Sequence, residues 1–354
     1  MYNTELVKIE DNLIKKQLIE QIAETSAIKK ASQYLLRNEV IAFPTETVYG
    51  LGANALEKQA VLKIFAAKGR PSDNPLIAHI ADKNQLPVLI EGNVSRIAER
   101  LINEFWPGPL TLIFDKSKRV PAITTAGLDT VAVRMPSHPV ALALISKVNL
   151  PLAAPSANSS GFPSPTRARH VYNDLNGKIP LIVDGGICNI GVESTVVELK
   201  ETSVNILRPG GITRKMIGDL IGDSFQVKTI NQVEVENPKS PGMKYKHYAP
   251  HTPLWIFKNN NLKQLLDQNN INNKKTLVIL TNETLGQIDE VSILAKILNM
   301  GSIDNLEYIA HNLFNLLREA DQKEFELILI EEVPDKDIGE AVMNRLKKAA
   351  VKII

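Results

Sequence analysis

Six short segments combine hydroxyl-bearing, small and cationic residues, and they hold most of the side chains that could do chemistry. Arg70, Arg134 and Arg208 carry planar guanidinium groups suited to phosphate and carboxylate, and Lys68 adds a point charge. Hydroxyls, together with backbone amides at turns that contain Gly and Pro, complete a cradle for phosphate. The pattern predicts a site that handles anions by positioning and electrostatics. The segments are PTETVYGLG (44–52), KGRPSDNP (68–75), TTAGLDTVAVRMP (124–136), AAPSANSSGFPSPT (153–166), GVEST (191–195) and LRPGG (207–211).

The alternative interpretation is that these segments are ordinary turns whose arginines pair with Asp or Glu at the surface. For any one segment, the ordinary turn is the simpler explanation. Six such segments in one domain favour a site, because turns alone do not require so many small and cationic residues together.

Nucleotide-binding motifs of the common kinds are not supported. Gly50, Gly52 and Ala55 spell GxGxxA, but six residues separate Phe43 from Gly50, and the downstream acidic position falls in basic KGR. A dinucleotide fingerprint needs its first glycine at the strand end. The sequence also has no GxxxxGK[ST] motif, so neither a nicotinamide cofactor nor a P-loop is expected.

Covalent catalysis and protein-built metal sites are not supported either. The sequence has no GxSxG motif, and Cys188 has no neighbouring cue for activation, which favours a quiet buried thiol. His247 and His251 are four residues apart, but Pro250 disfavours the helix that would align them on one metal.

Strands and helices mix over the first 218 residues without strict alternation, which predicts an α/β or α+β sheet domain. Pro44 ends a strand, each segment above is expected to sit at a strand end, and Ser26 is expected to cap the first long helix. The expected strands are 39–43, 76–80, 111–114, 130–135, 150–154, 181–186, 193–199 and 204–210, and the expected helices 26–35, 56–68, 94–104 and 138–147.

The rest of the chain divides into an extended connector, 219–251, and a small domain, 252–354. The connector has little apolar periodicity and ends in a proline-rich stretch. Strand–helix alternation in the small domain predicts a parallel α/β sheet, with an Asn-rich solvated helix face within 259–273.

The composition limits the cellular locations and the binding partners that are expected for this protein. The chain has 354 residues, one Cys and a net charge of +2, and it contains no apolar run long enough to span a bilayer. A charged N-terminal segment argues against a secretory leader. We therefore expect a cytoplasmic protein without strong global attraction to nucleic acid or membrane.

Taken together, the motifs resemble the threonylcarbamoyl-adenylate synthase family in its two-domain form, which has a YrdC-like catalytic domain. The resemblance spans nearly the whole chain, and no motif position departs from the family pattern. The matching segments are PTETVYGLG (44–52), KGRPSDNPL (68–76), the His of LIAHI, WPGPLT (106–111), AGLDTVAVRMP (126–136), APSAN (154–158), SPT (164–166), GVEST (191–195), LRPG (207–210) and PGMKYKHYAP (241–250).

This resemblance implies an open, twisted YrdC-like α/β domain followed by a smaller Rossmann-like domain. It also implies a nucleotidyltransferase that condenses L-threonine, bicarbonate and ATP to threonylcarbamoyl-AMP and pyrophosphate. Mg²⁺ would arrive on the ATP phosphates rather than on protein side chains. A downstream transferase would use the intermediate to modify adenosine 37 of tRNA, with at most weak RNA contact by the synthase itself and no membrane partner.

The resemblance also assigns residues to roles, with no protein nucleophile among them. Lys68 and Arg70 would act electrostatically near the phosphates. The implied threonine pocket is Thr47, His79, Arg134, Ala154 and Ser194, and the implied ATP site is Arg70, Asn74, Thr130, Ser156, Ser164, Arg208 and Tyr245. Spacing alone favours a core histidine for His79 and an aromatic packed between domains for Tyr245. The basic, aromatic connector could also close over the nucleotide as a lid.

Three other classes remain as alternatives. An RNA-binding module would use a positive cavity, but no basic stripe with interleaved aromatics is present. A carbamoyltransferase of related fold would carry Cys-rich modules, which a chain with one Cys lacks. A non-catalytic regulator would be expected to lose some of the arginines.

Overall fold

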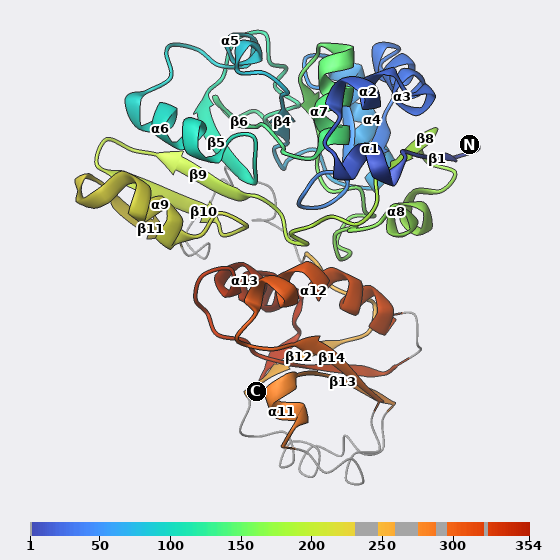
Figure 1. Cartoon of the computed structure of the whole chain (residues 1–354), viewed down its shortest axis with the longest axis vertical. Helices are drawn as coiled ribbons and strands as arrows, with labels where there is room; N and C mark the ends of the chain where they lie inside the picture. Colours follow the sequence, from blue (N-terminus) through green and yellow to red (C-terminus); the bar gives the residue numbers. More distant parts are fainter. Residues whose placement is uncertain (1, 231–246, 259–274, 288–295, 322–324) are drawn as a thin grey trace. The chain divides into compact units, whose positions relative to one another are not determined.

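The computed structural model describes residues 2–230, 247–258, 275–287, 296–321 and 325–354. The chain forms two compact units (Figure 1). The first comprises Met1–Ser160, Ser164–Asn189 and Glu193–Lys244. The second comprises Gly161–Pro163, Ile190–Val192 and Tyr245–Ile354.

The first unit is built on one mixed sheet of eleven strands, in the order β1-β8-β2-β3-β7-β4-β6-β5-β9-β10-β11. Its strands are β1 (Glu5–Lys8), β2 (Ile41–Phe43), β3 (Gly50–Asn54), β4 (Ile77–His79), β5 (Leu110–Asp115), β6 (Thr130–Arg134), β7 (Leu152–Ala153), β8 (Leu181–Asp184), β9 (Thr195–Leu199), β10 (Ser203–Arg208) and β11 (Gln226–Thr229).

Helices flank this sheet. They are α1 (Asp11–Lys15), α2 (Ile19–Glu24), α3 (Ser26–Leu36), α4 (Lys58–Lys68), α5 (Leu86–Leu89), α6 (Arg96–Phe105), α7 (Pro139–Val148), α8 (Ala168–Leu175) and α9 (Arg214–Ile221), with short 3₁₀ turns η1 (Lys83–Gln85) and η2 (Gly222–Ser224).

The sheet separates two apolar cores, because side chains of a strand alternate between its faces. On β2, Ile41 and Phe43 pack with α2, α3 and α7, whereas Ala42 belongs to the core that includes α4, α6, α8 and α9. Both faces of the central strands are therefore buried, and polar side chains gather at strand ends and in loops.

Strand register sets three polar residues side by side. β5 and β6 are antiparallel, with Thr111 opposite Arg134, while β6 and β4 are parallel, with Arg134 opposite His79. β9 runs parallel to β5 and pairs Thr195 with Leu110, which places Ser194 directly before this pair. The backbone pairing thus forms a row of Thr111, Arg134 and His79 across three neighbouring strands.

The second unit has a five-stranded, all-parallel sheet in the order β14-β13-β15-β12-β16. Helices α12 and α13 cover one face of it and α11 lies on the other (Figure 1). The elements are β12 (Leu254–Phe257), β13 (Thr276–Thr281), α11 (Asn282–Leu285), β14 (Lys296–Gly301), α12 (Leu306–Asp321), β15 (Leu327–Glu331), α13 (Gly339–Ala349) and β16 (Lys352–Ile353).

The α/β class and the parallel sheet of the second unit are confirmed, and several details differ from expectation. Thr25, rather than Ser26, caps α3, because its hydroxyl accepts a hydrogen bond from the Ile28 amide. Strand β11 lies within the expected connector and pairs with β10. The Asn-rich stretch 259–273 lies outside the described residues. No helix among the described residues is long and apolar enough to cross a membrane.

Candidate functional site

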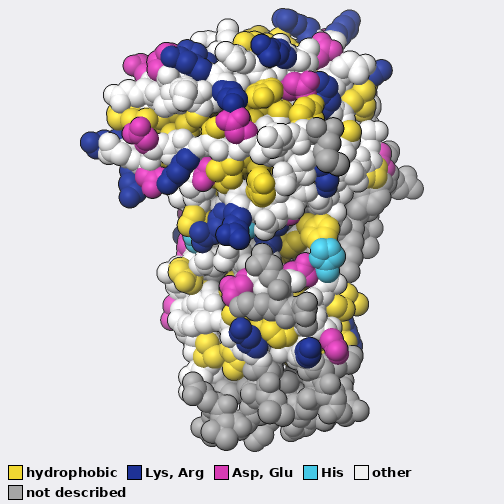
Figure 2. Space-filling view, turned by 90° about the vertical axis from the view of Figure 1, so that its right-hand side faces the viewer, with side chains coloured by type: hydrophobic (Ala, Val, Ile, Leu, Met, Phe, Trp, Pro, Cys, Tyr) yellow, Lys and Arg dark blue, Asp and Glu magenta, His cyan; other side chains and the backbone are white. Residues whose placement is uncertain are grey.

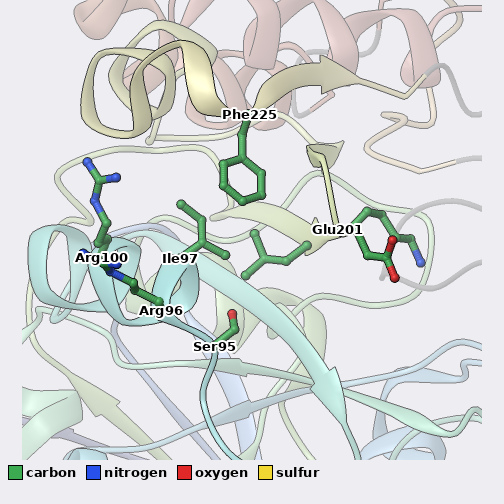
Figure 3. A pocket seen from close by; sticks show the side chains of 8 residues that line it. Ser95, Arg96, Ile97, Arg100, Glu201 and Phe225 are labelled. Carbon is green, nitrogen blue, oxygen red and sulfur yellow. The ribbon is translucent and has the colours of Figure 1, made fainter.

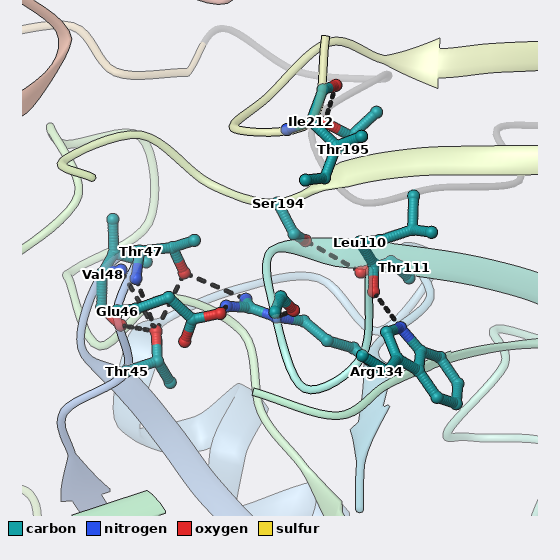
Figure 4. Close-up of polar contacts among 12 residues, drawn as sticks. Thr45, Glu46, Thr47, Val48, Leu110, Thr111, Arg134, Ser194, Thr195 and Ile212 are labelled. Atoms are coloured by element: carbon teal, nitrogen blue, oxygen red, sulfur yellow. Dashed lines mark hydrogen bonds and ion pairs between the residues drawn. The ribbon is translucent and has the colours of Figure 1, made fainter. Parts of the chain in front are cut away.

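A buried ion pair stands at the C-terminal end of β6. The Nη2 atom of Arg134 lies 2.6 Å from Oε1 of Glu46, and both side chains are almost fully buried. Arg134 also donates from Nη1 to the Thr47 hydroxyl at 2.9 Å and from Nε to the Gly108 carbonyl at 3.2 Å (Figure 4). The three contacts fix the guanidinium plane, which is the group expected to bind a substrate carboxylate.

Thr45 shapes the loop that brings Glu46 and Thr47 to this arginine. Its hydroxyl donates to the Val48 carbonyl at 2.6 Å and accepts from the amides of Thr47 and Val48, each at 3.2 Å (Figure 4). Such a side-chain-to-backbone turn holds the loop in one conformation. The Thr45 and Thr47 hydroxyls are themselves 2.8 Å apart.

Ser194 and Arg208 form the second part of the site. Arg208 donates to the Ser194 carbonyl from Nε and Nη2, at 3.1 and 3.0 Å, and from Nη2 to the Ser194 hydroxyl at 3.1 Å. The same hydroxyl lies 2.8 Å from that of Thr111 (Figure 4). Because Thr111 is the cross-strand partner of Arg134, these contacts connect Ser194 to the row on the sheet.

Gly210 allows the loop carrying Ser194 to approach closely. A Cβ atom at Gly210 would lie 2.3 Å from the Glu193 carbonyl oxygen and 2.4 Å from the Thr195 nitrogen. Contacts this short with backbone atoms exclude any side chain. The glycine of LRPGG is therefore required for packing rather than for an unusual φ angle.

His79 is buried and uncharged at neutral pH. Burial, followed by the positive charge of Arg134, lowers the pKa of His79 to about 3. Its Nδ1 lies 3.1 Å from the Ile77 carbonyl oxygen. The structure thus gives His79 a core position on β4, opposite Arg134 on β6.

Lys68 holds a loop of the site through its ammonium group. The Nζ atom donates to the carbonyl oxygens of Ser156 and Asn158 and, at 3.2 Å, to the Asn158 side-chain oxygen. The Ser156 hydroxyl in turn lies 2.5 Å from that side-chain oxygen. Lys68 is nearly fully buried, so its charge acts in a low-dielectric environment.

Of three further expected ATP residues, Asn74 and Ser164 are buried and Arg70 is half-buried. The Arg70 side chain donates to the Asn74 carbonyl at 3.3 Å. The Asn74 amide group itself has no hydrogen-bond partner among the described residues. An unsatisfied buried amide is costly in the absence of a ligand, which makes Asn74 a candidate ligand contact. Ser164 is fully buried and donates to Glu193 at 2.5 Å.

The remaining expected residues are Ala154, Thr130 and Tyr245, and neither of the two that the structure describes, Ala154 and Thr130, hydrogen-bonds to Arg134. Ala154 is buried and its amide bonds the Ile77 carbonyl, on the strand that ends in His79. Thr130 begins β6, whereas Arg134 ends it, so the two lie roughly 13 Å apart along the strand. Tyr245 lies outside the described residues, as do residues 231–246 of the connector expected to form a lid.

Sequence reasoning missed five polar residues that the structure brings to this site. They lie inside or beside the quoted motifs, so their positions could have been noted from the sequence. Residue type alone, however, does not show that a carboxylate, or a hydroxyl or amide that holds another side chain, will be buried at the site. The five are Thr45, Glu46, Thr111, Asn158 and Glu193.

Other potential sites carry less chemistry. Burial raises the pKa of the Cys188 thiol well above its ordinary value, so it is not a nucleophile. The described part of the chain has no group of three or more His, Cys, Asp or Glu residues placed to hold a metal. A separate open hollow of about 870 Å³ lies beside α6 (Figure 3), and no expected site residue lines it. Its lining is Ser95, Arg96, Ile97, Arg100, Leu199, Lys200, Glu201 and Phe225.

Comparison with known proteins decides the family. Residues 33–210 match the Sua5/yciO/yrdC family model, described as "Telomere recombination", and residues 212–351 match the model of the threonylcarbamoyl-AMP synthase C-terminal domain. The chain belongs to the threonylcarbamoyl-AMP synthase family. This membership confirms the resemblance drawn from the motifs, and it makes the chain a nucleotidyltransferase-type enzyme.

Individual members of the threonylcarbamoyl-AMP synthase family are similar over most of their length. The chain is 47% identical to the Pyrococcus abyssi synthase, covering 91% of this chain and 94% of that protein. Against the Bacillus subtilis synthase the identity is 48%, covering 91% and 92%. A crystal structure of P. abyssi Sua5 complexed with L-threonine superposes with a TM-score of 0.84 at 42% identity, covering 99% of each chain.

Proposed function

We propose that this protein condenses L-threonine, bicarbonate and ATP to threonylcarbamoyl-AMP and pyrophosphate. The proposal rests on the way the structure brings four side chains together. His79 and Arg134 lie side by side on neighbouring strands, and two adjoining loops add Thr47, which contacts Arg134, and Ser194, which contacts Thr111. The resemblance assigns the first four of these residues to threonine. Family membership and the threonine complex of the P. abyssi protein support L-threonine and ATP as substrates.

The proposed chemistry suits a site with cations and hydroxyls. The threonine amine forms a carbamate with bicarbonate, a carbamate oxygen attacks the α-phosphorus of ATP, and pyrophosphate leaves. Negative charge builds on the phosphoryl oxygens in this transfer, so fixed cations stabilise it. Lys68 and Arg70 are proposed to supply this charge, while Asn74, Thr130, Ser156, Ser164, Arg208 and Tyr245 are proposed to bind the nucleotide.

Mg²⁺ is proposed to enter with ATP, coordinated by its phosphate oxygens. Oxygen-rich phosphates suit this hard cation, which is often held in proteins by substrate phosphates and only one or two carboxylates. Bound there, the ion neutralises phosphate charge. Within the described residues, Lys68 and Arg70 are the groups assigned to the same phosphates.

The product is proposed to pass, in the cytoplasm, to a transferase that modifies adenosine 37 of tRNA. Only weak direct contact with RNA is proposed for this chain. On the face shown in Figure 2, Lys and Arg side chains are interspersed with Asp and Glu, so the described surface there has no continuous basic stripe.

Pyrophosphate release from ATP and Mg²⁺ tests this function. The purified chain should release pyrophosphate only when both L-threonine and bicarbonate are present. Release without threonine would contradict the proposed acceptor. A folded protein that binds ATP yet releases none would contradict the synthase activity itself.

A further inference from the structure

Glu46 is a buried carboxylate with an unused oxygen. Its side chain is 6% exposed, and Oε1 contacts Nη2 of Arg134. Among the described residues, no donor hydrogen-bonds to Oε2. A buried carboxylate oxygen without a donor is costly, and such an atom points to a missing ligand group.

Among the described residues, Arg134 is the one cation that forms an ion pair with Glu46. The Arg134 guanidinium contacts the Glu46 carboxylate directly. The other hydrogen bonds of Arg134 go to uncharged groups, the Thr47 hydroxyl and the Gly108 carbonyl. His138, the N-cap residue of α7, is close enough to Glu46 for the carboxylate charge to act to raise its pKa, but burial lowers that pKa to about 4. Burial and the Glu46 charge raise the pKa of Cys188. Near pH 7, therefore, Arg134 is the one counter-charge that the described residues provide.

A carboxylate and a guanidinium side by side are complementary to an amino-acid zwitterion. The α-ammonium and α-carboxylate of an amino acid are carried by one carbon atom, so the partners that bind them must also be neighbours. We propose that the α-ammonium of the substrate binds to Glu46 while its carboxylate binds to Arg134, and that Glu46 accepts the proton which the ammonium loses. This inference rests on the proposed function, since it takes L-threonine as the substrate.

The proton balance of the carbamate step shows what Glu46 contributes. The ammonium transfers one proton to the Glu46 carboxylate, which frees the nitrogen lone pair. The N–C bond forms at the bicarbonate carbon, a C–O bond breaks, and the leaving hydroxide takes a second nitrogen proton to become water. The products are a carbamate anion, one water molecule and protonated Glu46, with no net change in charge. An amine held next to its base in a buried site reacts more readily than one in bulk water.

The first test compares Glu46→Gln with Glu46→Asp in the full chain. Glu46→Gln keeps the shape and removes the charge, and we expect threonine affinity measured by calorimetry to fall about 10- to 160-fold, the range for a lost hydrogen bond to a charged group. Glu46→Asp, which keeps the carboxylate, should retain part of the threonine affinity that Glu46→Gln loses. The affinity for a non-hydrolysable ATP analogue should stay within about threefold. Glu198→Gln, the same change at a buried carboxylate on β9, serves as the control. Unchanged threonine affinity in folded Glu46→Gln would overturn the inference.

A second ligand separates ammonium binding from a mere positioning of Arg134. (3R)-3-hydroxybutanoate has the carboxylate and hydroxyl of threonine but no ammonium. If Glu46 binds the ammonium, Glu46→Gln should bind this analogue as well as the wild type does, or better. If Glu46 only orients Arg134, the analogue and threonine should lose affinity in equal proportion, and that result would refute the proposal.

The pH dependence of turnover tests the proton transfer. Without the Glu46 carboxylate the ammonium must lose its proton to water, so kcat of Glu46→Gln should rise up to tenfold per pH unit until the free amine dominates. A pH profile parallel to the wild type would exclude Glu46 as the base. Failure of the proposed function is distinguishable, because wild-type protein would then bind threonine but form no threonylcarbamoyl-AMP.

Discussion

His79 lies directly opposite Arg134, because β4 and β6 pair in parallel with these two residues in register. The imidazole is thus held in the interior next to a permanent positive charge. Burial and this charge together lower the pKa of His79 to about 3. A neutral ring is the form that can share a small pocket with a guanidinium without repulsion.

We expect the depressed His79 pKa to make the folded protein acid-sensitive. The unfolded chain takes up a proton near pH 6.5 and the folded chain does so only near pH 3, so the neutral ring contributes its full stability above pH 6.5. That contribution is lost as the pH falls from 6.5 towards 3, by about 1.4 kcal/mol per pH unit. Chemical denaturation between pH 7 and pH 4 should show a shallower decline for His79→Gln than for the wild type. Parallel curves would contradict this account.

Replacing Arg134 should affect threonine more than ATP. Arg134→Ala removes the proposed carboxylate partner and leaves Glu46 buried without its ion pair, which costs about 3–5 kcal/mol of stability. Arg134→Lys keeps the charge but loses the planar set of donors. We expect the lysine variant to fold and to raise KM for threonine far more than KM for ATP. Arg119→Ala, at an exposed position, is the control. Equal changes in both KM values would remove Arg134 from the threonine pocket.

Lys68→Met should impair ATP use. The substitution removes the charge proposed to lie near the phosphates and the hydrogen bonds that hold the Ser156 and Asn158 carbonyls. Steady-state kinetics should show KM for ATP raised at least about tenfold, with threonine binding within about threefold. Lys58→Met, an exposed position on the same helix, should behave as the wild type. If Lys68→Met has the same KM for ATP as the wild type, the proposed role of Lys68 at the phosphates is wrong.

Gly210→Ala should disturb Ser194 without altering any polar side chain. The new methyl would meet the backbone at Glu193 and Thr195, so the loop must move. We expect a loss of roughly 1–3 kcal/mol in unfolding free energy, as for overpacking, and a weaker threonine affinity. Gly218→Ala, where a Cβ atom meets nothing within 4 Å, is the matched control. Equal stability and equal threonine affinity in the two variants would show that the close approach at Gly210 is not required.

Helix capping offers a test that should leave activity intact. Thr25→Ala removes the hydroxyl that accepts the Ile28 amide and should cost about 1 kcal/mol in thermal or chemical unfolding. Ser26→Ala, the position expected from sequence to be the cap, should cost little because Ser26 is exposed and already helical. A larger effect at Ser26 would reverse the assignment.

The motifs made the cationic and hydroxyl groups of the candidate site predictable, since guanidinium and hydroxyl groups at strand ends imply anion chemistry from residue type alone. Arg134 and Ser194 were singled out from these motifs, and the structure places them in one network of buried polar contacts. The strand register that sets His79 and Thr111 on either side of Arg134 could not be read, because pairing between strands far apart in sequence leaves no local pattern. Glu46 was missed for a related reason. In PTETVYGLG a carboxylate looks like an exposed loop charge, and only the tertiary structure buries it against an arginine.

Where the expected helix and strand boundaries differ from the structure, the reason lies in the local sequence. Thr25 and Ser26 are both good caps, and sequence cannot choose between neighbours when helix ends are uncertain by a residue or two. The edge strand β1 is largely exposed, so it lacks the apolar alternation that marks a strand. Strand β11 is similarly half exposed and gains its structure by pairing with β10.

The row of Thr111, Arg134 and His79 has a consequence for how the protein acquires ligand affinity during folding. These three residues come from strands within 77–134, a stretch whose pairings close moderate loops, whereas Glu46 and Ser194 arrive from segments well outside it. A partly folded chain with only the central strands paired would hold the arginine but neither its carboxylate partner nor its serine neighbour. Threonine would then bind only the fully native state, and an excess of the amino acid would raise the unfolding temperature in proportion to the logarithm of its concentration.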